Sequence, residues 1–214
     1  MKSIVVLISG SGSNLQSIID HCNSGCIKGV VSLVISNNTE AFGLERAKNH
    51  DIPIKVIEHK NFNDRETFDE ELVSNIKKED PDLIVLAGFM RILTRTFTNA
   101  FINKVINIHP SLLPKYPGLN THEQVLNNKD VTHGITIHYV TEELDGGPII
   151  AQGSMRVDKD MDKDNLINKI HEIEHDLYPK VIAEILDGKV ELQDSSIHYN
   201  ESSSFKENNL RHYE

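Results

Sequence analysis

The 214-residue sequence has no tryptophan, only two cysteines and few aromatic residues of any kind. Cys22 and Cys26 are too few for a disulfide framework, and we expect both to be free thiols in a reducing cytoplasm. No apolar run approaches the ~20 residues that a membrane span requires. The apolar run at residues 4–8 is shorter than the core of a signal peptide, and polar residues follow it directly. The sequence therefore predicts neither a membrane protein nor a secreted one.

Positive charge is also scarce, because 32 Asp and Glu residues outnumber 22 Lys and Arg residues and give a formal net charge of −10 at pH 7. An acidic chain repels a phosphate backbone, so we do not expect broad nucleic-acid binding. A small anionic substrate remains compatible, since it needs only a local pocket. Hydrophobic residues make up 38% of the chain, and a chain of this length buries roughly 70% of its extended surface on folding. The composition is that of a globular protein with one main domain.

Short β-branched and leucine-rich runs alternate with helical patterns along most of the chain. The expected strands are residues 4–8, 30–36, 53–57, 82–87, 105–109, 134–140 and 148–151. The expected helices are residues 14–22, 41–49, a segment between an Asp64 N-cap and Pro81, 95–103, and 166–185 before a Gly188 cap. Repeated strand–helix–strand units predict an α/β fold, a Rossmann-like, open, mostly parallel twisted sheet with helices on both faces.

The composition changes after Gln193. We expect residues 1–193 to form the catalytic domain and residues 194–214, rich in Ser, Asn and Glu, to form a loosely attached or disordered tail that the chemistry does not need. The aromatic residues of this segment, Tyr199, Phe205 and Tyr213, could instead pack on the domain.

Residues 9–15, Ser-Gly-Ser-Gly-Ser-Asn-Leu, lie between the first expected strand and the first expected helix. Glycines let the backbone approach a ligand closely, and the free N–H groups at a helix start favour an anion. The loop lacks the third glycine of a dinucleotide fingerprint and the Gly-Lys-Ser/Thr of a Walker loop. Two interpretations stay open: a site for a single phosphate group, or a tight turn.

Asn107 and His109 stand two residues apart on an expected strand, so their side chains share a face. Pro110 ends that strand and leaves His109 at its carboxyl end, where open α/β sheets bind ligands. An amide donor beside a histidine suits acyl-type transfer, because both can stabilise an oxyanion and the histidine can exchange protons. Asp145 lies in an Asp-Gly turn, and if it reached His109 it would orient the ring and favour its protonated form. The alternatives are a buried structural pair and an ordinary turn.

Residues 171–175 read His-Glu-Ile-Glu-His and match the H-E-x-x-H pattern of zinc enzymes. No further histidine spacing of that class follows, and a catalytic zinc needs a third protein ligand. We therefore expect no metal.

Together these motifs resemble the glycinamide ribonucleotide formyltransferase family of purine biosynthesis, in its single-domain form that uses 10-formyltetrahydrofolate. The resemblance covers roughly residues 3–192. It is carried, in this order, by residues 5–10, 12–15, Ala-Gly-Phe-Met-Arg-Ile-Leu at 87–93, Asn-Ile-His-Pro-Ser-Leu-Leu-Pro at 107–114 and Leu-Asp-Gly-Gly-Pro at 144–148.

The resemblance implies a role for each of these segments. It makes Asn107, His109 and Asp145 the catalytic residues of a direct transfer through a tetrahedral oxyanion intermediate. It assigns the ribonucleotide to four residues, Gly12, Ser13 and Asn14 for the phosphate and Glu174 for the glycinamide amine. It assigns the folate co-substrate to six residues: Arg65, Met90, Arg91, Ile92, Leu93 and Asn107. His171 stands where we would expect Gln, and Thr136 where Ser is frequent, so the role of both positions is open.

Two other kinds of function remain alternatives. One is another folate-dependent formyl enzyme, a tRNA formyltransferase or a formyltetrahydrofolate hydrolase, although each usually carries an additional domain and the acidity of this chain disfavours tRNA. The other is a phosphate-binding module without catalysis. A formyl-transfer assay separates these possibilities. The oligomeric state does not follow from the sequence.

Overall fold

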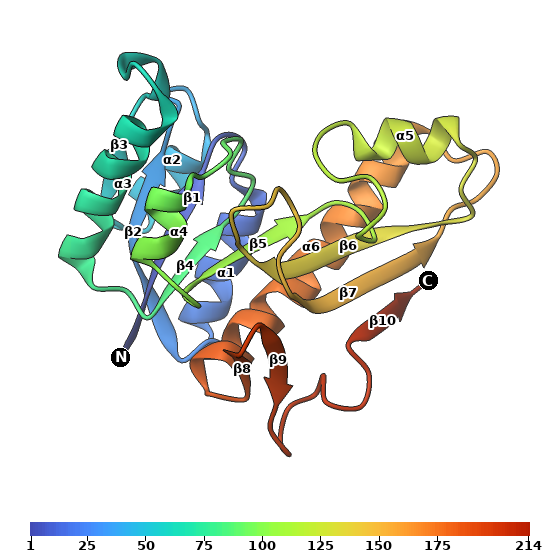
Figure 1. Cartoon of the computed structure of the whole chain (residues 1–214). Helices are drawn as coiled ribbons and strands as arrows, with labels where there is room; N and C mark the ends of the chain where they lie inside the picture. The colour runs from blue at the N-terminus through green and yellow to red at the C-terminus, as the bar shows by residue number, and fades with distance from the viewer.

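A computed structural model describes residues 1–214 as one eight-stranded sheet with helices on both faces, together with a two-stranded hairpin (Figure 1). The strands are β1 Lys2–Ile8, β2 Gly29–Ser36, β3 Ile54–Val56, β4 Leu83–Leu86, β5 Val105–His109, β6 Thr132–Tyr139, β7 Ile149–Arg156, β8 Val190–Gln193, β9 Ser196–Tyr199 and β10 Leu210–Tyr213. The helices are α1 Ser13–Asn23, α2 Gly43–Asn49, the 3₁₀ turn η1 His59–Asn61, α3 Arg65–Glu79, α4 Arg95–Ala100, α5 Thr121–Asn127 and α6 Lys163–Leu186.

The strand order in the large sheet is β10-β7-β6-β5-β4-β1-β2-β3. The five strands from β3 to β5 are parallel to their neighbours, whereas β6 is antiparallel to both β5 and β7. The predicted open, mostly parallel α/β sheet is therefore confirmed. The order 3-2-1-4-5 of the parallel part places the change of winding direction between β1 and β4, where such sheets bind ligands.

The two faces of the sheet carry separate hydrophobic cores. Along β1, Ile4, Val6 and Ile8 pack into the larger core with α1 and α6, whereas Val5 and Leu7 pack into the smaller core with α3 and α4. This alternation follows from the two-residue period of a strand. Burial on both faces explains why β1 reads as a continuous apolar run in the sequence.

The predicted helix ends agree with the structure where the cap is local. The Asp64 side chain accepts a hydrogen bond from the Thr67 N–H at 2.8 Å and caps α3. Gly188 follows α6 with φ of +68° and donates its N–H to the Ile185 carbonyl at 3.0 Å. α4 is shorter than expected and ends at Ala100.

The expectation of a loosely attached C-terminal segment is wrong. β9 pairs with β8 in a hairpin, and β10 adds to the large sheet as a parallel edge strand beside β7. Phe205 is only 1% exposed in the larger core, and the Tyr213 hydroxyl donates to the Asp176 carboxylate at 2.8 Å. The sequence pattern missed this order because single aromatic anchors separated by polar residues produce no apolar period.

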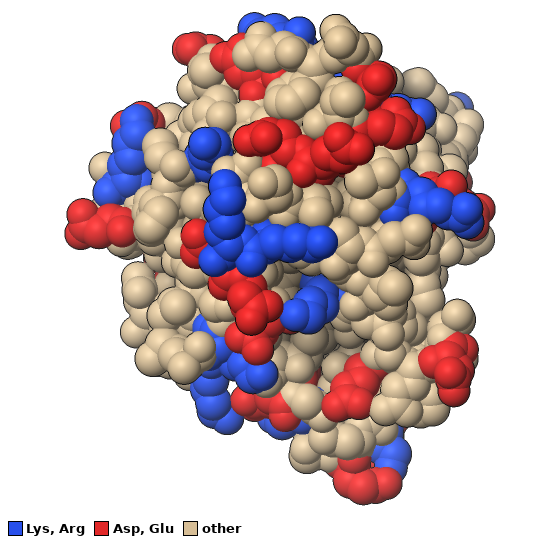
Figure 2. Space-filling view, turned by 60° about the vertical axis from the view of Figure 1, so that its left-hand side comes forward, with Lys and Arg blue, Asp and Glu red and all other residues tan.

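None of the helices is both long and apolar enough to cross a membrane. On the face that carries α3 and α4, acidic and basic side chains are interspersed (Figure 2). The negative net charge therefore does not exclude local positive sites on the surface.

Candidate active site

The carboxyl ends of three neighbouring strands lead into the segments that carry the candidate residues. β1 leads into the glycine-rich loop, β4 into residues 87–94 and β5 into the turn after His109. The Ser9 hydroxyl accepts a hydrogen bond from the Met90 N–H at 2.8 Å and links the first two segments directly. The fold thus gathers motifs that are about 100 residues apart in the sequence at one edge of the sheet.

His109 is buried, and both of its ring nitrogens lie beside hydrogen-bond acceptors. Nε2 is 2.8 Å from the Tyr116 carbonyl oxygen, which can only accept, so Nε2 carries a proton. Nδ1 is 3.4 Å from Oδ2 of Asp145, a carboxylate that is also largely buried. Hydrogen-bond acceptors thus lie beside both ring nitrogens, and one of them is an anionic carboxylate.

Asp145 is fixed by its own turn and by a second loop. It occupies the left-handed region at φ of +50°, and its Oδ2 accepts the Gly118 N–H at 2.8 Å. Its Oδ1 lies 3.8 Å from Nε2 of His138. One carboxylate therefore faces two histidines, and the turn that the sequence shows as Asp-Gly directs it to them.

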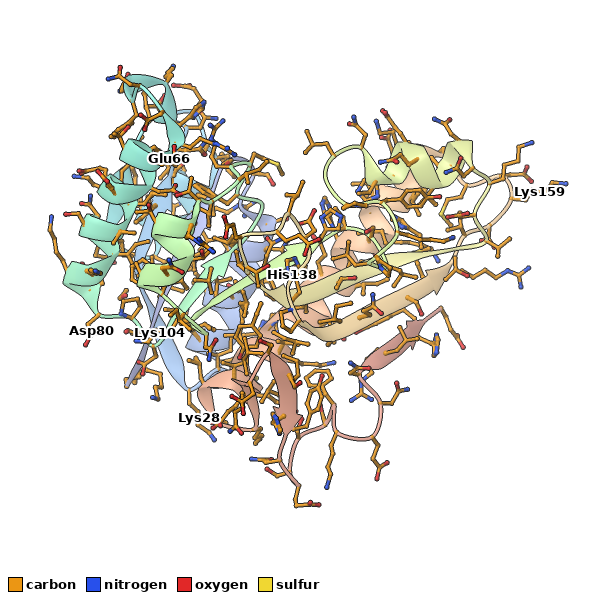
Figure 3. The ribbon with its side chains drawn as sticks, viewed as in Figure 1. Lys28, Glu66, Asp80, Lys104, His138 and Lys159 are labelled. Carbon is orange, nitrogen blue, oxygen red and sulfur yellow. The ribbon has the colours of Figure 1, made fainter.

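His138 lies opposite Asn107 in the pairing of β5 with β6, near the middle of the molecule (Figure 3). Its Nδ1 donates to the Tyr139 carbonyl at 2.8 Å, and burial lowers the pKa of the ring, so it is neutral at pH 7. Its Nε2 is then free to accept from the Asn107 amide nitrogen at 3.3 Å. His138 thereby orients the Asn107 amide. Sequence reasoning missed it, because its role depends on the register between two strands.

Beside these side chains lies a cavity of about 650 Å³. Its lining includes seven of the predicted site residues: Arg65, Met90, Arg91, Ile92, Asn107, His109 and Asp145. Leu144, next to Asp145, lines it as well. Two of the apolar lining residues, Met90 and Leu119, are 63% and 71% exposed. Exposed apolar side chains around a concave site favour a partly apolar ligand. Leu93 does not line this cavity but an adjoining pocket of about 90 Å³ that also contains His138.

The start of α1, which follows the glycine-rich loop, meets Glu174 where α1 packs against α6. Gly12 has φ of +69° and stands at the N-terminus of α1, and the Asn14 side chain donates to Glu174 Oε2 at 2.8 Å. The other amide atom of Asn14, Oδ1, is buried without a partner. Burial raises the pKa of Glu174 to about 7, although the bond from Asn14 opposes this shift. The structure thus brings together two predicted ribonucleotide contacts that lie 160 residues apart.

Four further histidines form two pairs. The rings of His171 and His175 stack with centroids 6.0 Å apart on α6, and His122 lies 3.0 Å from His133. No group of three or more His, Cys, Asp or Glu side chains is placed to hold a metal ion. Burial lowers the pKa of both His122 and His133 to about 4, so this pair is neutral at pH 7.

Thr136, one of the two positions whose role was open, holds the chain after β5. Its hydroxyl donates to the Ser111 carbonyl at 2.7 Å and accepts from the Leu113 N–H at 3.0 Å. Threonine provides the same hydroxyl as serine at this position, so the hydrogen bonds to the turn need no serine.

The fold and this site define an α/β enzyme with the equipment for acyl-type group transfer. An oriented amide and a histidine paired with a carboxylate can stabilise an oxyanion, and the adjacent cavity can hold a carrier of the transferred group.

Comparison with known proteins agrees with this class and narrows it. Residues 2–182 match the family model described as formyl transferase. The chain is 47% identical over 194 residues to the phosphoribosylglycinamide formyltransferase of Escherichia coli K12, covering 91% of this chain and 92% of the relative. The crystal structure of the Coxiella burnetii phosphoribosylglycinamide formyltransferase has a TM-score of 0.89 and 42% identity, with 92% of this chain and 93% of that one covered.

The Anaplasma phagocytophilum phosphoribosylglycinamide formyltransferase also has a TM-score of 0.89, at 37% identity, and its structure covers 100% of this chain and 99% of its own. That match includes the C-terminal segment. The chain therefore belongs to the formyl transferase family, and within it to the phosphoribosylglycinamide formyltransferases.

Proposed function

We propose that this enzyme transfers the formyl group of 10-formyltetrahydrofolate to the primary amine of N1-(5-phospho-D-ribosyl)glycinamide in purine biosynthesis. The observation that carries the proposal is the convergence of Asn107, His109 and Asp145 at a cavity lined by the predicted folate residues. The match to the Escherichia coli phosphoribosylglycinamide formyltransferase, over 91% of this chain, supports the same proposal.

The proposed chemistry is direct attack. The amine nitrogen bonds to the formyl carbon, and negative charge develops on the former formyl oxygen. The Asn107 amide and protonated His109 stabilise that oxygen by donating hydrogen bonds to it. The oxygen accepts the His109 Nε2–H in place of the Tyr116 carbonyl, which lies 2.8 Å from Nε2 in the structure. The bond from the formyl carbon to folate N10 then breaks, and the proton lost by the amine passes to the leaving nitrogen. Asp145 orients the His109 ring and assists this proton transfer, directly or through water.

The two substrates approach from opposite sides of the catalytic residues. The folate occupies the cavity that is lined by Arg65, residues 90–92 and Leu119. Leu93 lies in the adjoining pocket. The phosphate binds to the backbone N–H groups of Gly12, Ser13 and Asn14, which a helix start leaves free. Glu174 accepts a hydrogen bond from the glycinamide amine and positions it for attack.

No covalent enzyme intermediate and no metal enter this scheme. The co-substrate 10-formyltetrahydrofolate supplies the one-carbon group, and this chain supplies orientation, charge and proton transfer. The two thiols, Cys22 and Cys26, are free in the structure, and we propose a cytoplasmic location for the enzyme.

The test is a formyl-transfer assay with purified protein, 10-formyltetrahydrofolate and the ribonucleotide, followed by mass detection of the formylated product. Parallel reactions replace the ribonucleotide with methionyl-tRNA or with water alone. We expect product only with the ribonucleotide. Formylation of the tRNA, release of formate without an acceptor, or no reaction at all would each assign a different function.

A further inference from the structure

The segment that follows β4 has an unusual main chain. Residues 88–93 lie between β4 and α4 in no regular structure, and none of them makes a hydrogen bond to another main-chain group. Two side-chain acceptors hold this segment instead. The Ser9 hydroxyl accepts the Met90 N–H, and the Asp69 carboxylate accepts the Thr94 N–H at 2.5 Å.

Asp69 is a buried carboxyl group in the smaller core that forms no ion pair. Its residue is 0% exposed, it lies on α3 between buried Phe68 and Leu72, and no lysine or arginine forms an ion pair with it. Its second oxygen, Oδ1, has no hydrogen-bond partner. Burial raises the pKa of this carboxyl, and the bonds from Thr94 oppose the shift. A buried carboxylate without a counter-ion costs stability, so its presence needs a local reason.

The reason lies in what Asp69 connects. One turn before it on the same helix, Arg65 lines the cavity, and the Thr94 N–H that it accepts ends the segment whose Met90, Arg91 and Ile92 line the same cavity. Figure 3 shows this end of α3, marked by Glu66, at the opposite end of the helix from Asp80. Asp69 thus ties the two sides of one cavity wall together through a single carboxylate.

Buried and exposed side chains alternate along residues 88–93, and this alternation requires the backbone to be held in place. Phe89 and Leu93 are buried, whereas Met90 and Ile92 are 63% and 47% exposed toward the cavity. The segment has no main-chain hydrogen bonds that would maintain this alternation. Apart from the Met90 N–H, its main-chain N–H and C=O groups are free to bind a ligand. Fixing the chain at Met90 and at Thr94 lowers the entropy that is lost when a ligand orders the segment.

We infer that Asp69 is a positioning residue for the folate co-substrate: by holding the Thr94 N–H it pre-orders residues 88–93 against Arg65. The inference rests on the proposed function for the identity of the ligand. Asp69 does not touch the reacting atoms, and it acts through the backbone of the segment that does line the cavity.

The test uses the full chain with three substitutions. Asp69→Leu removes the acceptor at similar size, and Asp69→Asn keeps an oxygen that can accept the Thr94 N–H. Ile76→Val deletes one buried methylene from the same helix two turns away and serves as the matched control for weakened packing. If Asp69→Leu does not yield folded protein, Asp69→Ser, too short to reach Thr94, takes its place.

Two readouts are compared. In steady-state kinetics, Asp69→Leu is expected to raise KM for 10-formyltetrahydrofolate by about 10-fold or more, the worth of one hydrogen bond to a charged group, with little change in KM for the ribonucleotide. In hydrogen exchange, the amides of residues 90–94 are expected to exchange faster. Asp69→Asn should have a KM for 10-formyltetrahydrofolate and amide exchange rates close to those of the wild type. Ile76→Val should neither raise this KM selectively nor speed exchange at residues 90–94.

An unchanged exchange rate at Thr94, equal effects on both KM values, or the same pattern in Ile76→Val would overturn the inference and leave Asp69 a structural residue. Failure of the proposed function looks different. The wild-type chain would then show no formyl transfer, while the exchange measurement would still decide whether Asp69 orders the segment.

Discussion

Single side chains decide the chemistry of this site through the acceptors that surround them. His109 has an acceptor at each nitrogen, whereas His138, in the same network, donates at Nδ1 and accepts at Nε2. The two neighbouring histidines therefore have different surroundings: one faces two acceptors, and the other orients an amide.

Asp145→Asn tests the charge on His109. An asparagine oxygen at position 145 can still accept the Gly118 N–H, so the loop is retained, but the neutral amide no longer stabilises an imidazolium. We expect turnover to fall by about 10²–10⁴-fold, the usual range for a lost acid–base partner. Calorimetric affinity for the ribonucleotide should stay near the wild-type value, because the phosphate loop lies elsewhere. A comparable loss of ribonucleotide affinity would show that Asp145 supports binding rather than chemistry.

Glu174→Gln tests the buried carboxyl through the pH dependence of stability. The unfolded carboxyl ionises near pH 4.5 and the folded one near pH 7, so wild-type stability falls as the pH rises between these values. Glutamine keeps an oxygen for Asn14 and removes the charge. Relative to wild type, the variant should gain up to about 3 kcal/mol in free energy of unfolding at pH 8 but only about 1 kcal/mol at pH 5.

Urea denaturation at the two pH values measures this difference, with the exposed neighbour Glu172→Gln as control. The variant should also bind the ribonucleotide more weakly, since the proposed amine contact loses its charge. Equal stability changes at both pH values would show that Glu174 ionises normally in the folded chain.

At the scale of elements, local patterns predicted what local physics determines. The Asp64 and Gly188 caps and the buried runs of β1 and β5 were all readable, because each depends on neighbouring residues alone. α5 was missed because only Thr121 and Val125 are buried in it, which leaves no apolar period to detect. β10 was missed because its place beside β7 depends on a partner more than 50 residues away.

Gly12→Ala tests the joint between β1, α1 and α2. Gly12 adopts φ of +69°, and an added Cβ would lie 2.6 Å from the Gly43 Cα, which cannot move as a flexible side chain would. The left-handed conformation alone costs about 1–2 kcal/mol for an alanine, and the clash adds to it. We expect lower stability together with a raised KM for the ribonucleotide.

The matched control is Gly10→Ala, two residues earlier in the same loop. An added Cβ there meets nothing within 4 Å, and Gly10 is not in the left-handed region. Thermal melts and ribonucleotide kinetics of the two variants should therefore diverge. Equal behaviour would mean that the loop relaxes freely and that its backbone shape is not the basis of phosphate binding.

At the scale of the whole molecule, the candidate catalytic residues were more predictable than the residues that position them. Asn107 and His109 stood out because their residue types and strand position indicate a chemistry, whereas Asp145, in a turn, was assigned by the family resemblance. The positioning residues His138 and Asp69 could not be predicted in this way. His138 contacts Asn107 only through the pairing of β5 with β6, and Asp69 contacts Thr94 only through the packing of α3.

Deletion of residues 194–214 tests whether the C-terminal segment belongs to the fold. It removes Phe205 from the larger core, the Tyr213 bond to Asp176, and the strand that covers the edge of β7. Loss of a buried phenylalanine alone costs about 3–5 kcal/mol, so we expect strong destabilisation and poor recovery of folded protein. Phe205→Ala should reproduce much of the effect in urea denaturation. A truncated chain with wild-type stability would show that the segment is only an attachment.

The most direct test of the catalytic account is the turnover of His109→Ala, measured with the affinities for both substrates. If protonated His109 stabilises the oxyanion, turnover should fall by about 10²–10⁴-fold. Calorimetry should meanwhile find the ribonucleotide and tetrahydrofolate bound with nearly wild-type affinity, because alanine leaves the phosphate loop and the cavity walls in place. Turnover that stays within tenfold of wild type, with both substrates bound, would contradict the assignment of His109 as the catalytic group.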